Sequence, residues 1–135
     1  MNDPNRIGRD AFVVKSEDAP TKEIQFDRGY AIQLVNPGTG SERLDMHVNV
    51  LRPGAAVGPY HLHTEVENVY YILEGKVRIV LDGVAYEPSP GSAVFIPSGV
   101  PHSATNIGDS EARLLEIYAP PNRDFVWVSE DGGEV

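Results

Sequence analysis

The chain has 135 residues, a length that suits one domain with its own hydrophobic core. The net charge of −9, with few and scattered Lys and Arg residues, argues against a nucleic-acid partner or an anionic membrane surface. Cysteine is absent, so a transition-metal site would have to use histidine, carboxylate, amide or water ligands. No apolar run has the length of a membrane span, and residues 1–6 lack the apolar core of a secretory signal. The expected location is therefore the cytoplasm.

Short apolar runs, separated by Gly, Pro, Asn and Asp, recur along the chain at intervals of roughly 8–12 residues. The expected strands cover residues 11–15, 23–26, 30–35, 44–51, 68–73, 77–81, 84–87, 93–96 and 114–118. Asp82-Gly83, between the sixth and seventh of these runs, is a strong signal for a two-residue hairpin. The 13 Gly and 11 Pro residues argue against a helical protein. The sequence therefore predicts an all-β protein, and a barrel or jelly roll is favoured because it hides strand edges.

The chain has only four histidines, His47, His61, His63 and His102. Side chains two residues apart lie on the same face of a strand, so His61 and His63 could form half of a metal site. His102 follows a Pro- and Gly-containing turn, residues 97–101, that would deliver it at the start of a strand. It is the best candidate for a third ligand. Taken alone, however, the His-x-His pair could equally be two partly exposed strand histidines.

Two longer segments carry a family resemblance. Residues 91–106, GSAVFIPSGVPHSATN, read G-x5-P-x-G-x2-H-x3-N and resemble the second signature motif of the cupin superfamily at every defined position. Residues 53–75, PGAAVGPYHLHTEVENVYYILEG, resemble the first motif, G-x5-H-x-H-x3–4-E-x6-G. This resemblance implies a single-domain jelly-roll β-barrel (the cupin, or double-stranded β-helix, fold). It also implies one divalent transition metal ion on His61, His63 and His102, and imidazole ligands do not distinguish Fe, Mn, Ni, Zn and Cu.

The fourth ligand position departs from the family pattern. Counting back from Gly75 across the six-residue spacer places Asn68 where the family has glutamate, and Glu67 is one position early. A shift of one residue turns a strand side chain to the opposite face, so Asn68 is expected to point inward. Glu67 is the alternative ligand, and it would require a β-bulge or a position in the preceding turn. An amide in place of a carboxylate would weaken metal affinity and increase the attraction of the ion for an anionic substrate or hydroxide.

Other residues are candidates for the cavity wall. Tyr70 shares the parity of Asn68 and is a candidate catalytic acid or base, although a core aromatic is its ordinary role. His47 is expected at the surface or behind the ligands, and Asn106 is expected to tie a turn to the backbone. In the run 44–51 one alternating set packs inside, either Met46, Val48 and Val50 or His47, Asn49 and Leu51. Solvated positions are expected for Arg43, Arg78 and Arg113.

The chain divides into three expected parts. Residues 1–28 form an N-terminal arm that adds strands to the barrel, residues 29–120 form the barrel, and residues 121–135 form a tail. Phe125 and Trp127 lie in a short β-like apolar run of the tail that needs cover. Strand addition to the barrel or to a second subunit would supply this cover. The family resemblance implies a homodimer.

The resemblance also implies a function. It predicts a metal-dependent enzyme acting on a small oxygenated substrate, such as an organic acid, a sugar or a phenol, as a dioxygenase, decarboxylase, isomerase or lyase. The alternative is a non-catalytic small-molecule-binding or sensory cupin with weak or no metal, which the loss of the carboxylate ligand favours. The enzyme is preferred, because three histidines converging on one cavity are a costly way to build only a pocket.

Overall fold

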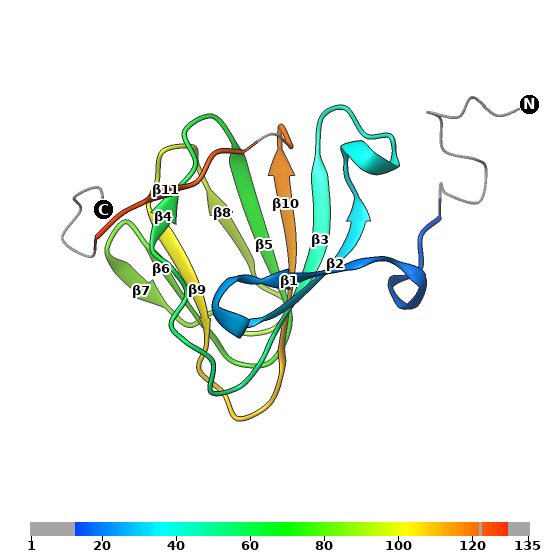
Figure 1. The fold of residues 1–135 in the computed structure, drawn as a ribbon. Helices are drawn as coiled ribbons and strands as arrows, with labels where there is room; N and C mark the ends of the chain where they lie inside the picture. The colour runs from blue at the N-terminus through cyan, green and yellow to red at the C-terminus, as the bar shows by residue number, and fades with distance from the viewer. Residues whose placement is uncertain (1–12, 122, 130–135) are drawn as a thin grey trace, which may run out of the picture.

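The structure is a computed structural model that describes residues 13–121 and 123–129, and over these residues the protein is all-β (Figure 1). The outer parts of the expected arm and tail, residues 1–12, 122 and 130–135, lie outside the described residues. Short 3-10 segments interrupt the strands at Ser16–Asp18 (η2), Gln25–Asp27 (η3) and Pro37–Thr39 (η4). No helix among the described residues is long and apolar enough to cross a bilayer.

The strands form two antiparallel sheets. The six-stranded sheet has the order β1-β2-β3-β10-β5-β8, and the five-stranded sheet has the order β11-β4-β9-β6-β7. The first sheet consists of β1 (Thr21–Ile24), β2 (Gly29–Val35), β3 (Asp45–Leu51), β10 (Ala112–Ala119), β5 (Glu67–Glu74) and β8 (Ala93–Ile96). The second consists of β11 (Val126–Trp127), β4 (His61–Leu62), β9 (His102–Asn106), β6 (Val77–Leu81) and β7 (Val84–Tyr86). The predicted jelly-roll fold is confirmed.

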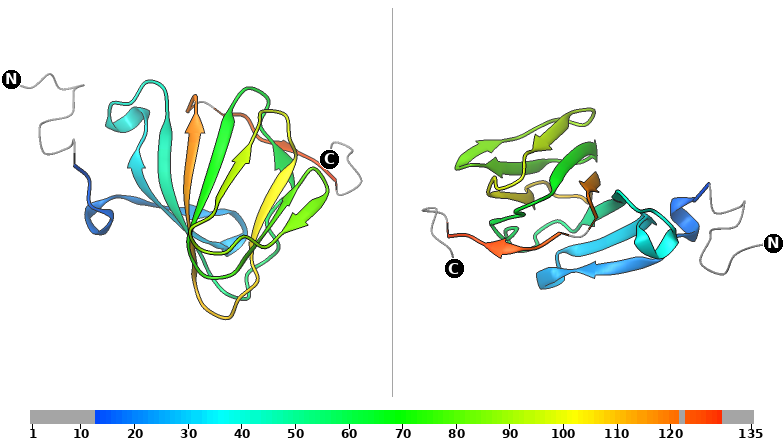
Figure 2. Two further views of the ribbon diagram at one scale, coloured as in Figure 1. Left: turned by 180° about the vertical axis from the view of Figure 1, so that it is seen from behind. Right: turned by 90° about the horizontal axis from the view of Figure 1, so that it is seen from above.

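The main core lies between the two sheets, which face each other in both views of Figure 2. Its buried members are Leu51, Tyr70, Ile72, Val77, Ile79, Ile96, Ala104, Ala112 and Leu114. A second cluster of Ile32, Val48 and Val50 packs under Ala19 and Tyr30. Strand β3 is therefore covered on both sides, with Leu51 in the core between the sheets and Val48 and Val50 in the second cluster.

Most expected strands are present, and the differences have local reasons. Asp82 and Gly83 join β6 to β7 with φ values of 48° and 82°, the left-handed conformation that a tight hairpin requires. Of the expected strand 11–15, residues 13–15 form no strand, and residues 11–12 lie outside the described residues. The expected strand 23–26 ends at Ile24, because Phe26 and Asp27 take positive φ values of 63° and 54° to turn the chain back into β2.

The η3 turn and strand β11, which are far apart in the sequence, contact each other beside the barrel. Strand β1 pairs with β2 and extends the six-stranded sheet, while β11 pairs with β4 and extends the five-stranded sheet. The rings of Phe26 and Trp127 then meet edge to face, with centroids 5.8 Å apart. Of the two ways to cover the tail, strand addition within the same chain is the one that the structure shows, and the tail's path across the barrel is visible in Figure 1.

Candidate metal centre

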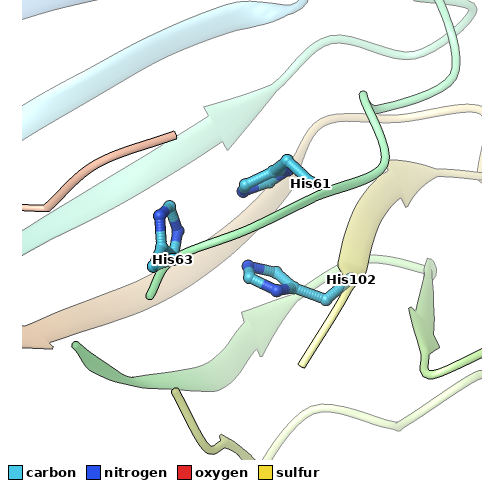
Figure 3. A group of neighbouring side chains, drawn as sticks. All are labelled: His61, His63 and His102. Atoms are coloured by element: carbon cyan, nitrogen blue, oxygen red, sulfur yellow. The ribbon is translucent and has the colours of Figure 1, made fainter. Parts of the chain in front are cut away.

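Three histidines from two distant parts of the chain come together between the sheets. His61 lies in β4 opposite His102 of β9, and His63 follows His61 on the same side of the chain. Their ring centroids are 4.3 Å (His61–His102), 4.9 Å (His61–His63) and 5.2 Å (His63–His102) apart. Candidate ligand atoms of the three lie within 4.8 Å of one another, and Figure 3 shows the rings facing a common point.

Each ring is held by a hydrogen bond from its Nδ1 to a backbone carbonyl oxygen. His61 donates to Pro59 at 2.8 Å, His102 donates to Val100 at 2.9 Å, and His63 donates to Asp124. A carbonyl oxygen can only accept, so Nδ1 carries the proton and Nε2 keeps its lone pair. Nε2 of His63 and of His102 is buried without a hydrogen-bond partner. This is the arrangement that oriented histidine ligands adopt around a metal.

The three rings are neutral near neutral pH. Burial, with the neighbouring His102 as the next contribution, lowers the pKa of His61 to about 3. Burial also lowers the pKa values of His63 and His102 below the ordinary histidine value. Neutral imidazoles with free Nε2 atoms are the form that binds divalent transition metals, so the residues present fit a metal ion.

Asn68 faces the interior and Glu67 does not. Asn68 is fully buried in β5, whereas Glu67 is exposed. The side-chain amide of Asn68 donates to Oε2 of Glu116 at 3.1 Å and to the carbonyl of Ile117 at 3.0 Å. Its Oδ1 is buried without a hydrogen-bond partner. Of the two residues considered for a fourth ligand, only Asn68 presents an unsatisfied oxygen inside the barrel.

Glu116 is the residue that organises the wall beside the histidines. It lies in β10, is 3% exposed, and accepts hydrogen bonds from Nε2 of His47 at 2.9 Å and Nδ2 of Asn49 at 2.7 Å. Tyr70 and Tyr118 also hydrogen-bond to it. Burial alone would raise the pKa of Glu116, but the bond and charge of His47 and the other donors hold it well below the ordinary value. The carboxylate therefore stays ionised and saturated with donors.

Both tyrosines are buried and remain neutral. Tyr70 is 4% exposed and Tyr118 is 5% exposed. Burial, followed by the charge of Glu116, raises the pKa values of both hydroxyls well above the ordinary value. The ring of Tyr70 lies 6.4 Å from that of His102, and the ring of Tyr118 lies 5.2 Å from that of His63. Each phenol is thus next to the histidines and unable to ionise near neutral pH.

A cavity of about 230 Å³ lies beside the metal centre. Its lining includes His61, Tyr70, Glu116, Tyr118 and Arg28. Phe125 of the tail covers one side of the metal centre, because its ring stacks on His61 with centroids 4.0 Å apart and planes 8° from parallel. The cavity is therefore polar at its floor and closed by an aromatic ring at one edge.

A family profile described as Cupin domain matches residues 47–118, more than half of the chain. The chain belongs to the cupin family. This cupin is 38% identical, over 81% of its length and 88% of the relative's, to an uncharacterized protein of Methanocaldococcus jannaschii. It is 31% identical to polyketide synthase CurC of Streptomyces cyaneus, covering 73% of this chain and 66% of that one. The structure of polyketide cyclase RemF from Streptomyces resistomycificus superposes with a TM-score of 0.74 at 29% identity, covering 88% of this cupin and 87% of RemF.

Some residues around the site of this cupin were expected from the sequence and others were not. His47, expected at the surface or behind the ligands, is buried against Glu116, so the surface alternative is wrong. Glu116 itself carried a signal, because it alternates with Leu114 and Tyr118, and all three are buried on the same face of β10. The apolar run of the tail indicated that Phe125 needs cover but not that it lines the cavity, and no sequence pattern singled out Arg28, which reaches the cavity from the arm. Asn106 ties its turn as expected, donating to the carbonyls of Leu51 and Ser110 at 2.9 Å.

Proposed function

We propose that this cupin is a metal-dependent enzyme that acts on a small oxygenated substrate by coordinating one of its oxygens and promoting enolisation, as in an isomerisation or cyclisation. The proton that leaves the carbon next to the carbonyl passes to solvent water in the cavity. The observation that carries the proposal is the convergence of His61, His63 and His102 with Nε2 of two of them buried and unpaired. A site of three neutral histidines leaves positions open for substrate or water, as catalytic metal sites do.

The protein groups that would hold the ion are the three Nε2 atoms, with Oδ1 of Asn68 as the fourth donor. When bound, a divalent ion supplies a Lewis acid that polarises a carbonyl or stabilises an enolate oxygen. The hydrogen bonds from Nδ1 to Pro59, Asp124 and Val100 fix the rings before the ion arrives. Because no carboxylate contributes, the ion would keep more positive charge than in a site of three histidines and glutamate.

Tyr70 is the proposed catalytic side chain. Tyr70 lines the cavity, and its hydroxyl hydrogen-bonds to Glu116. Burial and Glu116 raise the pKa of Tyr70 well above its ordinary value, so the phenol does not act as a base near neutral pH. It can instead donate a hydrogen bond to a substrate oxygen on which negative charge develops. Glu116 acts by orienting the phenol, because its oxygens are already occupied by donors.

Polyketide relatives support an oxygenated substrate. CurC and RemF are named for polyketide synthesis and cyclisation, and they share 31% and 29% identity with this chain. Polyketides are chains rich in carbonyl groups, and carbons next to carbonyls are the ones that enolise. The small volume of about 230 Å³ favours a substrate of few heavy atoms over a full polyketide chain.

One observation favours a second function, a barrel that binds a small molecule without chemistry. The buried carboxylate of the cavity, Glu116, is hydrogen-bonded by His47, Asn49 and Asn68 and by two tyrosines, so it is not a free base. Metal analysis and proton exchange separate the two functions.

The experiment begins with elemental mass spectrometry of protein purified from metal-replete medium. We expect about one Fe, Mn, Ni, Zn or Cu per chain, lost in His63→Ala and retained in His47→Gln, which replaces a histidine outside the cluster. The loaded protein is then incubated in D₂O with a panel of small oxo and hydroxy compounds, and C–H exchange is followed by NMR. Exchange that Tyr70→Phe slows supports the enzyme. Absence of metal would contradict the proposal, and metal without exchange across the panel would favour the binding protein.

A further inference from the structure

Arg28 places a buried positive charge in the wall of the cavity. It follows η3, lines the cavity and is only 8% exposed. Its Nη2 donates to the carbonyl of Ala104 in β9 at 2.7 Å. A guanidinium has five N–H donors, and this is its only hydrogen bond within the described residues. The remaining donors are therefore available to a ligand.

This charge has no counterion in contact. No carboxylate of the described residues lies within 4.0 Å of the Arg28 guanidinium, although ion pairs form at Arg52, Arg78 and Arg113. Burial lowers the pKa of Arg28, and Glu116 compensates it only at longer range. Buried charges are normally paired, because removing an ion from water is costly. An unpaired guanidinium facing a cavity indicates that an anion completes the site.

The absence of a side chain at Gly58 leaves room for the Arg28 guanidinium. A Cβ atom at Gly58 would lie 2.8 Å from Nη2 of Arg28 and 2.1 Å from the carbonyl oxygen of Ala104. Any larger residue would therefore displace the guanidinium or the strand beside it. The amide of Gly58 is fixed by a hydrogen bond to Oγ1 of Thr105 at 2.9 Å. The Arg28 side chain thus fits between the segment that leads to β4 and strand β9, and we call this position the Arg28 site.

The Arg28 site is close to the histidines. Ala104 lies two residues after His102, so both side chains face the same way and their backbone positions are about 7 Å apart along β9. A cavity of about 230 Å³ is lined by both Arg28 and His61. A second guanidinium, that of Arg123, also lines the cavity, 4.2 Å from the centre of the Tyr118 ring. A molecule in this cavity can therefore contact both Arg28 and His61.

We infer that Arg28 is the anion-binding residue of this cavity, and that the ligand is a small organic anion, a carboxylate or a phosphate ester, with an oxygen function at its other end. The anionic group would lie on the guanidinium, and the oxygen function would face His61, His63 and His102. This inference rests on the proposed function for the second contact, but the anion site itself does not require a metal.

The test uses calorimetric titration of the zinc-loaded protein with matched ligand pairs. Pyruvate is compared with neutral hydroxyacetone, and dihydroxyacetone phosphate with dihydroxyacetone. A charge-assisted contact predicts that the anion of at least one pair binds about 10- to 100-fold more tightly than its neutral partner. Preference for pyruvate identifies a carboxylate ligand, and preference only for the phosphate identifies a phosphate ester.

Three variants assign the preference to Arg28. Arg28→Gln removes the charge and should abolish the discrimination, whereas Arg28→Lys should keep part of it because the charge remains. The matched control is Arg78→Gln, which removes an arginine paired with Glu87, neither of which lines the cavity, and it should keep the full preference. If Arg28→Gln fails to fold, the wild-type comparison and Arg28→Lys still decide.

Equal binding of anion and neutral partner by the wild type, or no binding of either anion, would overturn the inference. If folded Arg28→Gln still prefers the anion over its neutral partner, the inference is also overturned. The role of Arg28 would then be only the hydrogen bond that joins the arm to β9. The same titrations on metal-free protein show whether the anion preference depends on metal, so a failure of the anion site can be distinguished from a failure of the proposed metal-dependent function. If the protein binds no zinc but still prefers the anion over its neutral partner, the anion site is supported and the metal-dependent reaction is contradicted.

Discussion

Nε2 of His47 lies 2.9 Å from Oε1 of Glu116, its partner in the register between β3 and β10. Nδ1 of the same ring lies 2.6 Å from Oδ1 of Asp45. Both carboxylates accept, so both ring nitrogens must carry protons and the imidazole is cationic. Burial would lower the pKa of His47, but the hydrogen bonds and charges of Asp45 and Glu116 raise it to about 9. A buried charge network therefore forms the floor of the cavity.

This network predicts a stability that falls at alkaline pH. The pKa of His47 is about 9 in the folded protein and 6.5 ordinarily, so its contribution is complete below about pH 6.5 and disappears as the pH rises through 9. The free energy of unfolding of metal-free protein should drop by about 2 kcal/mol between about pH 7 and pH 9. Urea unfolding at several pH values measures it. His47→Gln should lack most of this slope, and a wild type with a flat profile over this interval would disprove the assignment.

Glu116 should be the most sensitive position of the network. Glu116→Gln keeps the size but leaves His47 with one fewer counterion and places an amide donor against the donors of Asn49 and Asn68. Breaking a buried pair in this way costs about 3 kcal/mol. Urea unfolding should show this loss, while Glu74→Gln, at an exposed pair with Arg113, should change the stability by less than about 0.5 kcal/mol. Similar values for the two variants would argue against the network.

Asn68 should limit the affinity for metal. Asn68→Asp replaces the proposed amide ligand by a charged oxygen, and zinc should bind about 10-fold more tightly. The same change removes a donor to Glu116 and sets two carboxylates against each other, so the metal-free protein should melt at a lower temperature. Competition with a chelating dye and thermal unfolding measure the two effects. Asn49→Asp is the matched control, since it also loses a bond to Glu116 but should not gain zinc affinity. Equal zinc affinity for wild type and Asn68→Asp would place Oδ1 out of reach of the ion.

The strands and the pairing of His61 with His63 could be anticipated from short-range patterns, whereas the metal site on all three histidines was implied by the resemblance to the cupin motifs. Alternation and turn residues predicted most strands, and the Asp82-Gly83 hairpin formed where two positive φ values are tolerated. The spacing of His61 and His63 determines that they share a face, and the motif around His102 supplied the third ring. Counting to Gly75 favoured Asn68 over Glu67 as the inward residue, and the burial of the two side chains agrees.

The remaining parts of the site depend on pairings between distant segments, which no local pattern encodes. Arg28 reaches the cavity because η3 turns the arm back toward β9 and because Gly58 leaves room for the guanidinium. Phe125 covers His61 because β11 pairs with β4. His47 becomes a buried cation only when β3 and β10 place it opposite Glu116. The groups that would select a substrate are those that the sequence did not reveal.

X-ray absorption at the zinc edge tests most directly whether three imidazoles share one ion. Zinc-loaded wild-type protein should show three histidine nitrogens at about 2.0–2.1 Å together with one or more oxygens. His102→Ala should lose a histidine scatterer or fail to hold zinc, and His47→Gln should give the wild-type spectrum. Zinc bound only by oxygen ligands, or a His102→Ala spectrum identical to that of the wild type, would contradict a metal centre on His61, His63 and His102.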